Sequence, residues 1–316
     1  MSKLFLLFGV FMILNSASLS EVATQSKTVE LAIEIKAELG EGAFWDSVNK
    51  RLFWVDIEGR KAYVYDPEEN VNQSFELPSR VGTIVPRNRN EAVVALEDGI
   101  YILNLKSGAV TLLVELEKEL KSTRFNDGKC DPNGNLWVGS MDLNTTLPLG
   151  SLYKVSPKGK ADKMLDKITV SNGIVWTKDR RTMYYIDTPT GHIKAFDFDL
   201  ETSLISNERI AVPVDASLGY PDGMTIDEND RLWVGMWQGE AVACFDPIAG
   251  KLIKKIQVPA LNVTSCAFGG EDLETLFITT ARVGMSEEEK LKFPLAGSVF
   301  QVKPGVRGVD GYYFGK

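Results

Sequence analysis

The feature that most constrains the fold is a phrase that recurs six times: a small residue, a short apolar run, a polar turn and a second apolar run. The six copies begin at Gly42, Gly82, Gly128, Gly173, Gly223 and Cys266. Successive copies are therefore 40, 46, 45, 50 and 43 residues apart. A period of about 40 to 50 residues with strand-turn-strand content is typical of a β-propeller blade. The sequence predicts an all-β, six-bladed β-propeller.

The polar residues that open the repeats are expected to converge on one axis. In a propeller the first strand of each blade lines the central channel. Glu41, Asn172 and Asp222 stand at three of these openings, and Asn126 and Asp127 stand together at a fourth. Carboxylate and amide oxygens are the ligands that hard divalent cations prefer. The sequence therefore predicts a metal site at one end of the channel.

Composition favours one globular domain and excludes one class of partner. No linker or low-complexity tract interrupts the repeats, and hydrophobic residues make up 44% of the 316 residues, so we expect residues 21–316 to form a single domain. The net charge of -8 has the wrong sign for binding a phosphate backbone, and no basic run is present. Nucleic acid is excluded as a partner, and the sequence implies no protein partner.

The N-terminus resembles a secretory signal. Lys3 precedes an apolar run over residues 4–14, and small residues follow up to Ser20. This run is too short to span a bilayer, whereas a positive start, a short apolar run and small residues are typical of a signal peptide. We therefore expect residues 1–20 to be a signal peptide, the mature protein to be secreted, and the chain to have no membrane span. A membrane anchor or a buried strand is the alternative.

Two further features bear on the compartment. Three Asn-x-Ser/Thr triplets agree with secretion, although such triplets are common by chance; they begin at Asn72, Asn144 and Asn262. An odd number of cysteines leaves at least one thiol unpaired or paired between chains. The three are Cys130, Cys244 and Cys266. Buried free thiols are the expectation, and a single disulfide is the alternative.

The side chains exclude several kinds of catalysis. The chain has one histidine, His192, which lies in a turn between two expected strands. A Ser-His-Asp triad or a His-rich zinc site would need this residue, but the repeat places it at the rim of the ring. Neither a Gly-x-Gly-x-x-Gly motif nor a P-loop is present. Any chemistry must come from carboxylates, amides, arginine and a metal.

The two ends of the chain are predicted to close the ring. Residues 29–36 and 297–302 alternate apolar and polar side chains, as outer strands do. An N-terminal strand that completes the blade made by the C-terminus would remove the open sheet edges. Helix is expected only at residues 285–292, whose acidic start suits a helix N-terminus.

Several motifs in a fixed order make the chain resemble a known family. They include residues 39–45, 124–129, 170–173, 184–188, 219–224 and 263–270. These segments are similar to those of the family that contains gluconolactonases, regucalcin (senescence marker protein) and the insect luciferin-regenerating enzymes. The resemblance covers nearly the whole chain after the signal. It implies a six-bladed propeller that holds one divalent cation at the top of its channel.

The resemblance also implies roles for individual residues. Glu41, Asn172 and Asp222 match the metal ligands of the family, and Arg124 and Asn126 match groups that contact the substrate. Oxygen ligands with water in the remaining positions suit Ca²⁺, Mg²⁺ or Mn²⁺. Ca²⁺ is the favoured ion, with Zn²⁺, Mn²⁺ and Mg²⁺ as alternatives.

One segment departs from the family pattern. Many members carry an acidic residue that faces the pocket after the motif Gly-Thr-Met. Here the acid is shifted to Asp142, which we take as a third substrate-binding residue, and Asn144 occupies the matching place. A glycan on Asn144 would obstruct the pocket, so this residue is expected to be unmodified in a working enzyme.

Other polar and aromatic residues of the repeats are predicted to be structural. Asp and Asn before Gly are common turn formers, and three aspartates are expected to brace turns or backbone amides. These are Asp127, Asp131 and Asp227. Four tryptophans recur at blade positions and are expected to pack in the core: Trp45, Trp137, Trp176 and Trp233.

The leading hypothesis is a secreted, divalent-metal-dependent hydrolase of lactones or similar cyclic esters. The cation would polarise the carbonyl, Asp222 would act as general base toward water, and Arg124 and Asn126 would orient the substrate. A calcium-binding or small-ligand-binding propeller without turnover is the alternative. A protein-interaction propeller would have a non-polar or plugged channel end, and the polar openings of the repeats argue against it.

Overall fold

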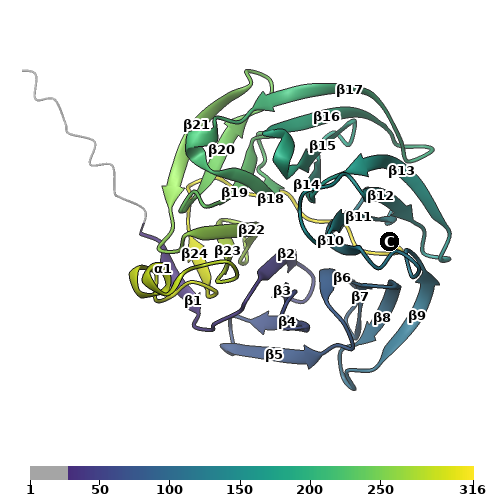
Figure 1. Ribbon diagram of the computed structural model, residues 1–316, viewed down its shortest axis with the longest axis horizontal. Helices are drawn as coiled ribbons and strands as arrows, with labels where there is room; N and C mark the ends of the chain where they lie inside the picture. The colour runs from purple at the N-terminus through teal and green to yellow at the C-terminus, as the bar shows by residue number, and fades with distance from the viewer. Residues whose placement is uncertain (1–27) are drawn as a thin grey trace, which may run out of the picture.

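The computed structural model describes residues 28–316, which form six four-stranded antiparallel sheets around a central channel (Figure 1). The predicted six-bladed β-propeller is confirmed. The expected signal peptide, residues 1–20, lies outside the described residues. Within residues 28–316, no helix has the length and apolar character needed to cross a membrane.

The first three blades are continuous in sequence, and each runs outward from the channel. Blade 1 contains β2 (Gly40–Asp46), β3 (Arg51–Asp56), β4 (Lys61–Asp66) and β5 (Val71–Glu76). Blade 2 contains β6 (Val81–Asn88), β7 (Glu91–Leu96), β8 (Gly99–Asn104) and β9 (Val110–Glu115). Blade 3 contains β10 (Thr123–Cys130), β11 (Leu136–Asp142), β12 (Gly150–Val155) and β13 (Ala161–Ile168).

The next two blades follow the same order. Blade 4 contains β14 (Ser171–Trp176), β15 (Thr182–Asp187), β16 (His192–Asp199) and β17 (Leu204–Pro213). Blade 5 contains β18 (Tyr220–Ile226), β19 (Leu232–Trp237), β20 (Ala241–Asp246) and β21 (Lys251–Gln257). Short 3₁₀ turns, η1 (Thr188–Thr190) and η2 (Ala216–Leu218), lie before β16 and β18.

Blade 6 closes the ring with both ends of the chain. It contains β22 (Asn262–Gly269), β23 (Thr275–Ala281), β24 (Val299–Val302) and, as its outermost strand, β1 (Glu30–Ile33). The predicted closure by the N-terminal strand is confirmed. The predicted helix is also confirmed as α1 (Glu287–Lys292), where Ser286 and Glu289 form a capping box.

Each inner strand carries a β-bulge at the same place. Its register with the second strand shifts after Glu41, Val81, Phe125, Ser171, Pro221 and Val263. In a β-bulge, two residues of one strand lie opposite a single residue of its partner, and the direction of a side chain changes. The bulge glycines also permit close approach, because a Cβ on Gly223 would lie 2.6 Å from Ser265 Oγ on the next inner strand. The repeated small residue therefore has a structural cause.

Two of the three aspartates that were predicted to be structural brace equivalent turns. Asp131 accepts hydrogen bonds from the backbone N–H of Asn133 and from Trp137 Nε1, both at 2.9 Å. Asp227 accepts one from Trp233 Nε1, also at 2.9 Å, in blade 5. The four tryptophans predicted for the core are each no more than 4% exposed. The expected structural roles of these residues are confirmed.

The cysteines and the histidine also lie as expected. All three cysteines are buried and have free thiols. His192 is the first residue of β16, and its Nδ1 lies 2.9 Å from the carbonyl oxygen of Thr190 in the preceding turn. Neither kind of side chain lines the cavity described below.

The glycosylation triplets differ in exposure, which the sequence did not reveal. Asn262 is 2% exposed at the start of an inner strand, so a glycan there is incompatible with the fold. Asn72 lies within β5, where its Oδ1 accepts a hydrogen bond from Trp54 Nε1 at 3.2 Å. Asn144 alone of the three is exposed in a loop.

Residues 303–316, which we call the C-terminal strap, cross the ring (Figure 1). The backbone N–H of Val309 donates to the carbonyl oxygen of Ile226 (3.3 Å), and that of Phe314 donates to the carbonyl oxygen of Pro86 (3.0 Å). Both acceptors lie toward the C-terminal ends of inner strands. The strap therefore covers the face opposite to the one where the inner strands begin.

We expect the strap to stabilise the ring, and Tyr313→Phe tests this. The Tyr313 hydroxyl donates to Asp46 Oδ1 (2.7 Å) and accepts from the backbone N–H of Val48 (3.2 Å). Removing it should lower the free energy of unfolding by about 1–2 kcal/mol in denaturant titrations. Tyr220→Phe, which removes the hydroxyl of a tyrosine that is 51% exposed, should have little effect, and equal effects of the two changes would contradict the prediction.

Candidate functional site

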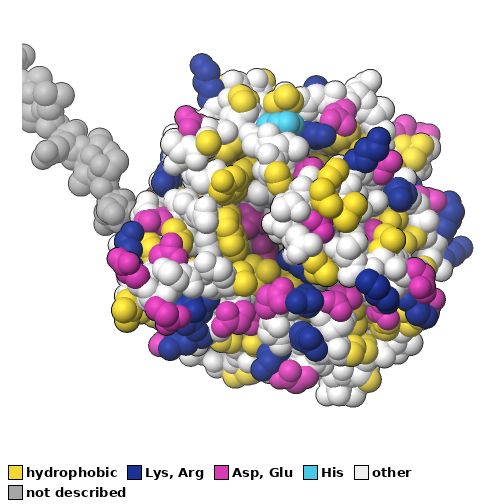
Figure 2. All heavy atoms as spheres, in the orientation of Figure 1, with side chains coloured by type: hydrophobic (Ala, Val, Ile, Leu, Met, Phe, Trp, Pro, Cys, Tyr) yellow, Lys and Arg dark blue, Asp and Glu magenta, His cyan; other side chains and the backbone are white. Residues whose placement is uncertain are grey.

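A cavity of about 700 Å³ opens at the face where the inner strands begin, and side chains from all six blades line it. This volume lies in the range of about 300–1,000 Å³ that is usual for small-molecule sites. Its lining includes five residues of the predicted site: Glu41, Arg124, Asn126, Asn172 and Asp222. Acidic side chains lie deep in the central hollow, and hydrophobic side chains border it (Figure 2).

The three predicted metal ligands converge on the floor of this cavity. Glu41, Asn172 and Asp222 are only 4–5% exposed and come from blades 1, 4 and 5. Asn172 and Asp222 are the first bulge residues of their strands, and Glu41 directly precedes its bulge. The repeated bulge is therefore the local structure that turns these side chains toward one point.

The two carboxyl groups on the floor strongly affect each other. Burial raises the pKa of Glu41 to about 8, and the negative charge of Asp127 adds to this effect. Burial also raises the pKa of Asp222 well above its usual range, and the neighbouring charge of Glu41 is the next cause. The side chains of Glu41 and Asp222 are hydrogen-bonded to each other.

The donor atoms fit a divalent cation. Two buried carboxyl groups in contact must share a proton or bind a cation, because two bare negative charges repel. Asn172 Oδ1 accepts a hydrogen bond from Asn126 Nδ2 at 3.0 Å and retains a second lone pair. Residues 28–316 contain no group of three His, Cys, Asp or Glu side chains suited to a metal. A cation here would therefore have two carboxylates, one amide and water, a set that suits Ca²⁺ better than Zn²⁺.

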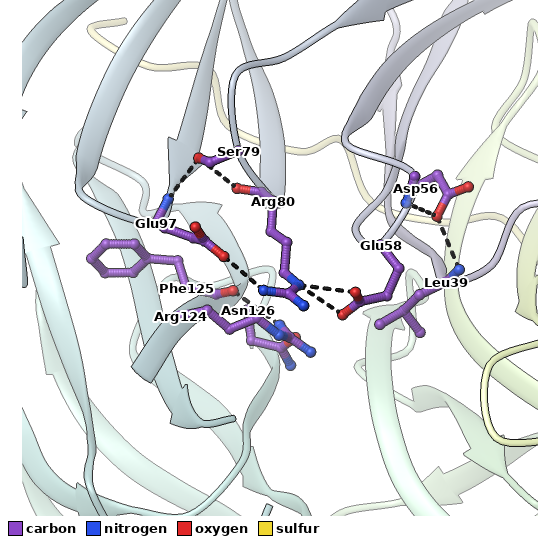
Figure 3. A network of polar contacts seen from close by, with 10 residues as sticks. Leu39, Asp56, Glu58, Ser79, Arg80, Glu97, Arg124, Phe125 and Asn126 are labelled. Carbon is purple, nitrogen blue, oxygen red and sulfur yellow. Dashed lines mark hydrogen bonds and ion pairs between the residues drawn. The ribbon is translucent and has the colours of Figure 1, made fainter. Parts of the chain in front are cut away.

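Arg124 and Asn126 connect the cavity wall to the floor. Arg124 Nη1 donates to the carbonyl oxygen of Phe125 (3.0 Å) and to Asn126 Oδ1 (2.6 Å), as Figure 3 shows. Asn126 Nδ2 donates to the carbonyl oxygen of Ser171 (2.7 Å) as well as to Asn172 Oδ1. Burial lowers the pKa of Arg124 to about 10, so the guanidinium stays charged at neutral pH.

The structure places Asp142 outside the cavity, in contrast to the sequence-based expectation. Its Oδ2 accepts hydrogen bonds from the backbone N–H groups of Thr146 (3.1 Å) and Leu147 (3.0 Å), so it holds the loop after β11. Asn144 does not line the cavity either, but its neighbours Leu143 and Thr145 do. Asp142 therefore has a turn-bracing role, and Asn144 stands beside the mouth.

Asp127 is buried next to the floor residue Asn126 and fits its expected bracing role only in part. Its Oδ1 accepts a hydrogen bond from the backbone N–H of Gly128 at 2.7 Å. Its Oδ2 is buried without a hydrogen-bond partner in the part of the chain that the structure describes. Burial raises the pKa of Asp127, which is consistent with this incomplete pairing.

Comparisons with known proteins show the family of this chain. Residues 39–282 match the family model described as the SMP-30/Gluconolactonase/LRE-like region. The chain belongs to this family. It is 40% identical over 273 residues to the "Putative sugar lactone lactonase YvrE" of Bacillus subtilis, covering 86% of this chain and 94% of that protein. It is 36% identical over 289 residues to regucalcin of Danio rerio, covering 90% and 98%.

Solved structures of the family have the same architecture. The structure of a calcium-binding regucalcin from Agrobacterium tumefaciens superposes with a TM-score of 0.87 at 27% identity, covering 91% of this chain and 97% of that one. A luciferin-regenerating enzyme superposes with a TM-score of 0.84 at 32% identity, covering 91% and 99%. The resemblance inferred from the motifs is therefore confirmed.

An ion-pair cluster lies at the mouth of the cavity, and the sequence analysis did not predict it. Arg80 Nε donates to both carboxylate oxygens of Glu58 (3.0 and 2.9 Å), and Arg80 Nη1 donates to Glu97 Oε1 at 2.9 Å (Figure 3). Glu58 and Arg80 line the cavity. The repeat does indicate the face on which these residues lie. In an antiparallel blade, residues just before an inner strand or just after a second strand lie at the same face as Glu41.

Proposed function

We propose that the protein hydrolyses lactones or similar cyclic esters with the help of one divalent cation. Glu41, Asn172 and Asp222 would hold the ion, with Ca²⁺ as the favoured metal and Mn²⁺, Mg²⁺ and Zn²⁺ as alternatives. The observation that carries the proposal is the convergence of two buried carboxyl groups, an amide and a charged arginine on one cavity floor. Membership of a family whose relatives include a named sugar lactone lactonase supports it.

Together with a bound cation, the residues on the floor provide the groups that ester hydrolysis needs. A bound cation would polarise the ester carbonyl and stabilise the negative charge that develops on its oxygen. Asp222 accepts a proton from water as the water oxygen bonds to the carbonyl carbon. The ring C–O bond then breaks, and the ring oxygen takes up the proton to give a hydroxy acid. Arg124 and Asn126 orient the substrate oxygens during these steps.

A second candidate is cation binding without turnover. The hydrogen-bonded pair of Glu41 and Asp222 would bind Ca²⁺ whether or not a substrate is hydrolysed. The structural similarity to a calcium-binding regucalcin favours this alternative. It does not require Asp222 to act as a base.

An assay of the purified protein on a panel of lactones separates the two candidates. We expect turnover with Ca²⁺ or Mn²⁺ present, loss of turnover with a chelator, and recovery when the metal is restored. Cation binding in calorimetry without turnover of any lactone would favour the second candidate. Turnover that a chelator leaves unchanged would contradict the role of the metal.

We also propose that the protein is secreted and that Asn144 carries no glycan in the active form. Asn144 is exposed between two residues that line the cavity, so a glycan there would occupy the path of the substrate. In a glycosylating host, Asn144→Gln should raise kcat/KM by roughly tenfold if the wild-type site is occupied and leave it unchanged if it is not.

Mass spectrometry of the secreted protein checks the proposal. It should show a mature N-terminus near residues 19–21 and an unmodified Asn144. Full glycan occupancy of Asn144 with undiminished turnover would show that the substrate enters by another route. A protein retained inside the cell with residues 1–20 intact would contradict secretion.

A further inference from the structure

The cavity is divided into a polar floor and a largely apolar upper part. The five predicted site residues on the floor are each no more than 7% exposed. The rest of the lining includes apolar side chains from blades 3 to 6. These apolar side chains include Met141, Leu143, Val170, Tyr220, Trp237 and Val283.

Two aromatic residues, Tyr220 and Trp237, belong to this apolar lining. Tyr220, at the start of β18, is the direct cross-strand partner of Trp237, at the end of β19. Directly opposed residues of an antiparallel pair project from the same face of a sheet, with Cβ atoms about 5 Å apart. Tyr220 is 51% exposed although it lines the cavity, so its ring is accessible to a ligand.

Most polar groups above the floor are already paired within the protein, whereas Gln238, which also lines the cavity, has an exposed amide that a ligand can reach. Thr188 Oγ1 donates to the carbonyl oxygen of Pro221 (2.8 Å), and Thr145 Oγ1 donates to that of Asn144 (2.7 Å). The guanidinium of Arg80 is paired with the carboxylates of Glu58 and Glu97. Ligand hydroxyls buried in this upper part would therefore find few partners, which disfavours them.

We infer that the substrate is a cyclic ester with an apolar substituent, such as an alkyl chain or an aromatic ring, rather than a polyhydroxylated sugar lactone. This inference rests on the proposed function. The ester group lies against the polar floor near Asp222 and Arg124, and the substituent packs on Tyr220 and Trp237. The volume of about 700 Å³ leaves room for a substituent beyond a single six-membered ring.

Three lactones with the same six-membered ring test this inference. They are δ-valerolactone, which is unsubstituted, δ-decalactone, which carries a pentyl chain, and glucono-δ-lactone, which carries hydroxyl groups. With the Ca²⁺-loaded full chain, kcat/KM for δ-decalactone should exceed that for either of the others by roughly 10-fold or more. Equal or higher kcat/KM for glucono-δ-lactone would overturn the inference.

Variants of Trp237 test whether the preference for an apolar substituent depends on the aromatic pair. Trp237→Ala should lower kcat/KM for δ-decalactone by roughly 10- to 100-fold and leave δ-valerolactone nearly unchanged, whereas Trp237→Phe should retain most of the preference. Ile248→Ala, which truncates a side chain that is 91% exposed in another loop of blade 5, is the matched control. Equal losses on both lactones in Trp237→Ala would overturn the inference.

Failure of the proposed function gives a different result. If the Ca²⁺-loaded protein hydrolyses none of the three lactones, the proposed hydrolysis is wrong, and calorimetry then tests the cavity directly. Tighter binding of δ-decalactone than of glucono-δ-lactone, weakened in Trp237→Ala, supports an apolar ligand. Tighter binding of glucono-δ-lactone, or binding of neither, overturns the inference.

Discussion

Replacing Asp222 with alanine is expected to abolish lactone hydrolysis and tight cation binding together. The change removes one of the two buried carboxylates on the cavity floor and the proposed general base. We expect Ca²⁺ affinity to fall at least roughly 100-fold because the charge of the ligand set is halved. We expect kcat/KM to fall by about 1000-fold or more, which corresponds to about 4 kcal/mol of transition-state stabilisation.

A second substitution separates the two roles of this residue. Asp222→Asn retains an oxygen donor at the same place but can neither carry the charge nor accept the proton, so it should bind Ca²⁺ weakly and show no turnover. Glu287→Gln on α1 removes one charge from a side chain that is 88% exposed and is the matched control. Unchanged Ca²⁺ affinity of a folded Asp222→Ala protein in calorimetry would show that the ion binds elsewhere.

The sequence predicted the ring because the repeat encodes its most restrictive contacts. Inner strands meet near the axis, where a side chain on Gly82 would lie 2.5 Å from the carbonyl oxygen of Asn126. Small residues must therefore recur once per blade, and a period of that kind is visible in a single sequence. Residues next to these glycines, such as Asn172 and Asp222, could be placed at the channel for the same reason.

Residues outside the repeated phrase could not be placed in this way. Asp142 and Asn144 lie in a loop whose conformation depends on hydrogen bonds to the Asp142 carboxylate, and spacing alone does not specify these bonds. Asn262 belongs to a sequence triplet that carries no information about burial, yet it is the first residue of β22. The pairing of Arg80 with Glu58 joins two blades, so the repeat indicates the face on which each residue lies but does not specify that the two pair.

Arg124→Leu is expected to lower kcat/KM by about 100-fold and to leave Ca²⁺ affinity nearly unchanged. The lost contact is a charge-assisted hydrogen bond in a buried site, for which about 2.7 kcal/mol is a reasonable magnitude. Arg124 lines the cavity and is not a proposed ligand, so its removal should affect the substrate and not the ion. Steady-state kinetics and calorimetry on the same preparation measure both quantities.

The hydrogen bond from Arg124 to Asn126 offers a second explanation for a loss of activity in Arg124→Leu, and the same measurements distinguish the two explanations. Asn126 in turn donates to Asn172 Oδ1, so Arg124 could act on the ion indirectly by holding this chain in place. In that case Ca²⁺ affinity would fall in Arg124→Leu in parallel with kcat/KM, and a positioning role would replace substrate contact. Arg209 is a half-exposed arginine on the outermost strand of blade 4, where it pairs with Asp197. Arg209→Leu should change neither Ca²⁺ affinity nor kcat/KM. Arg124→Lys should recover only part of the activity, because a single ammonium cannot reproduce the planar set of donors.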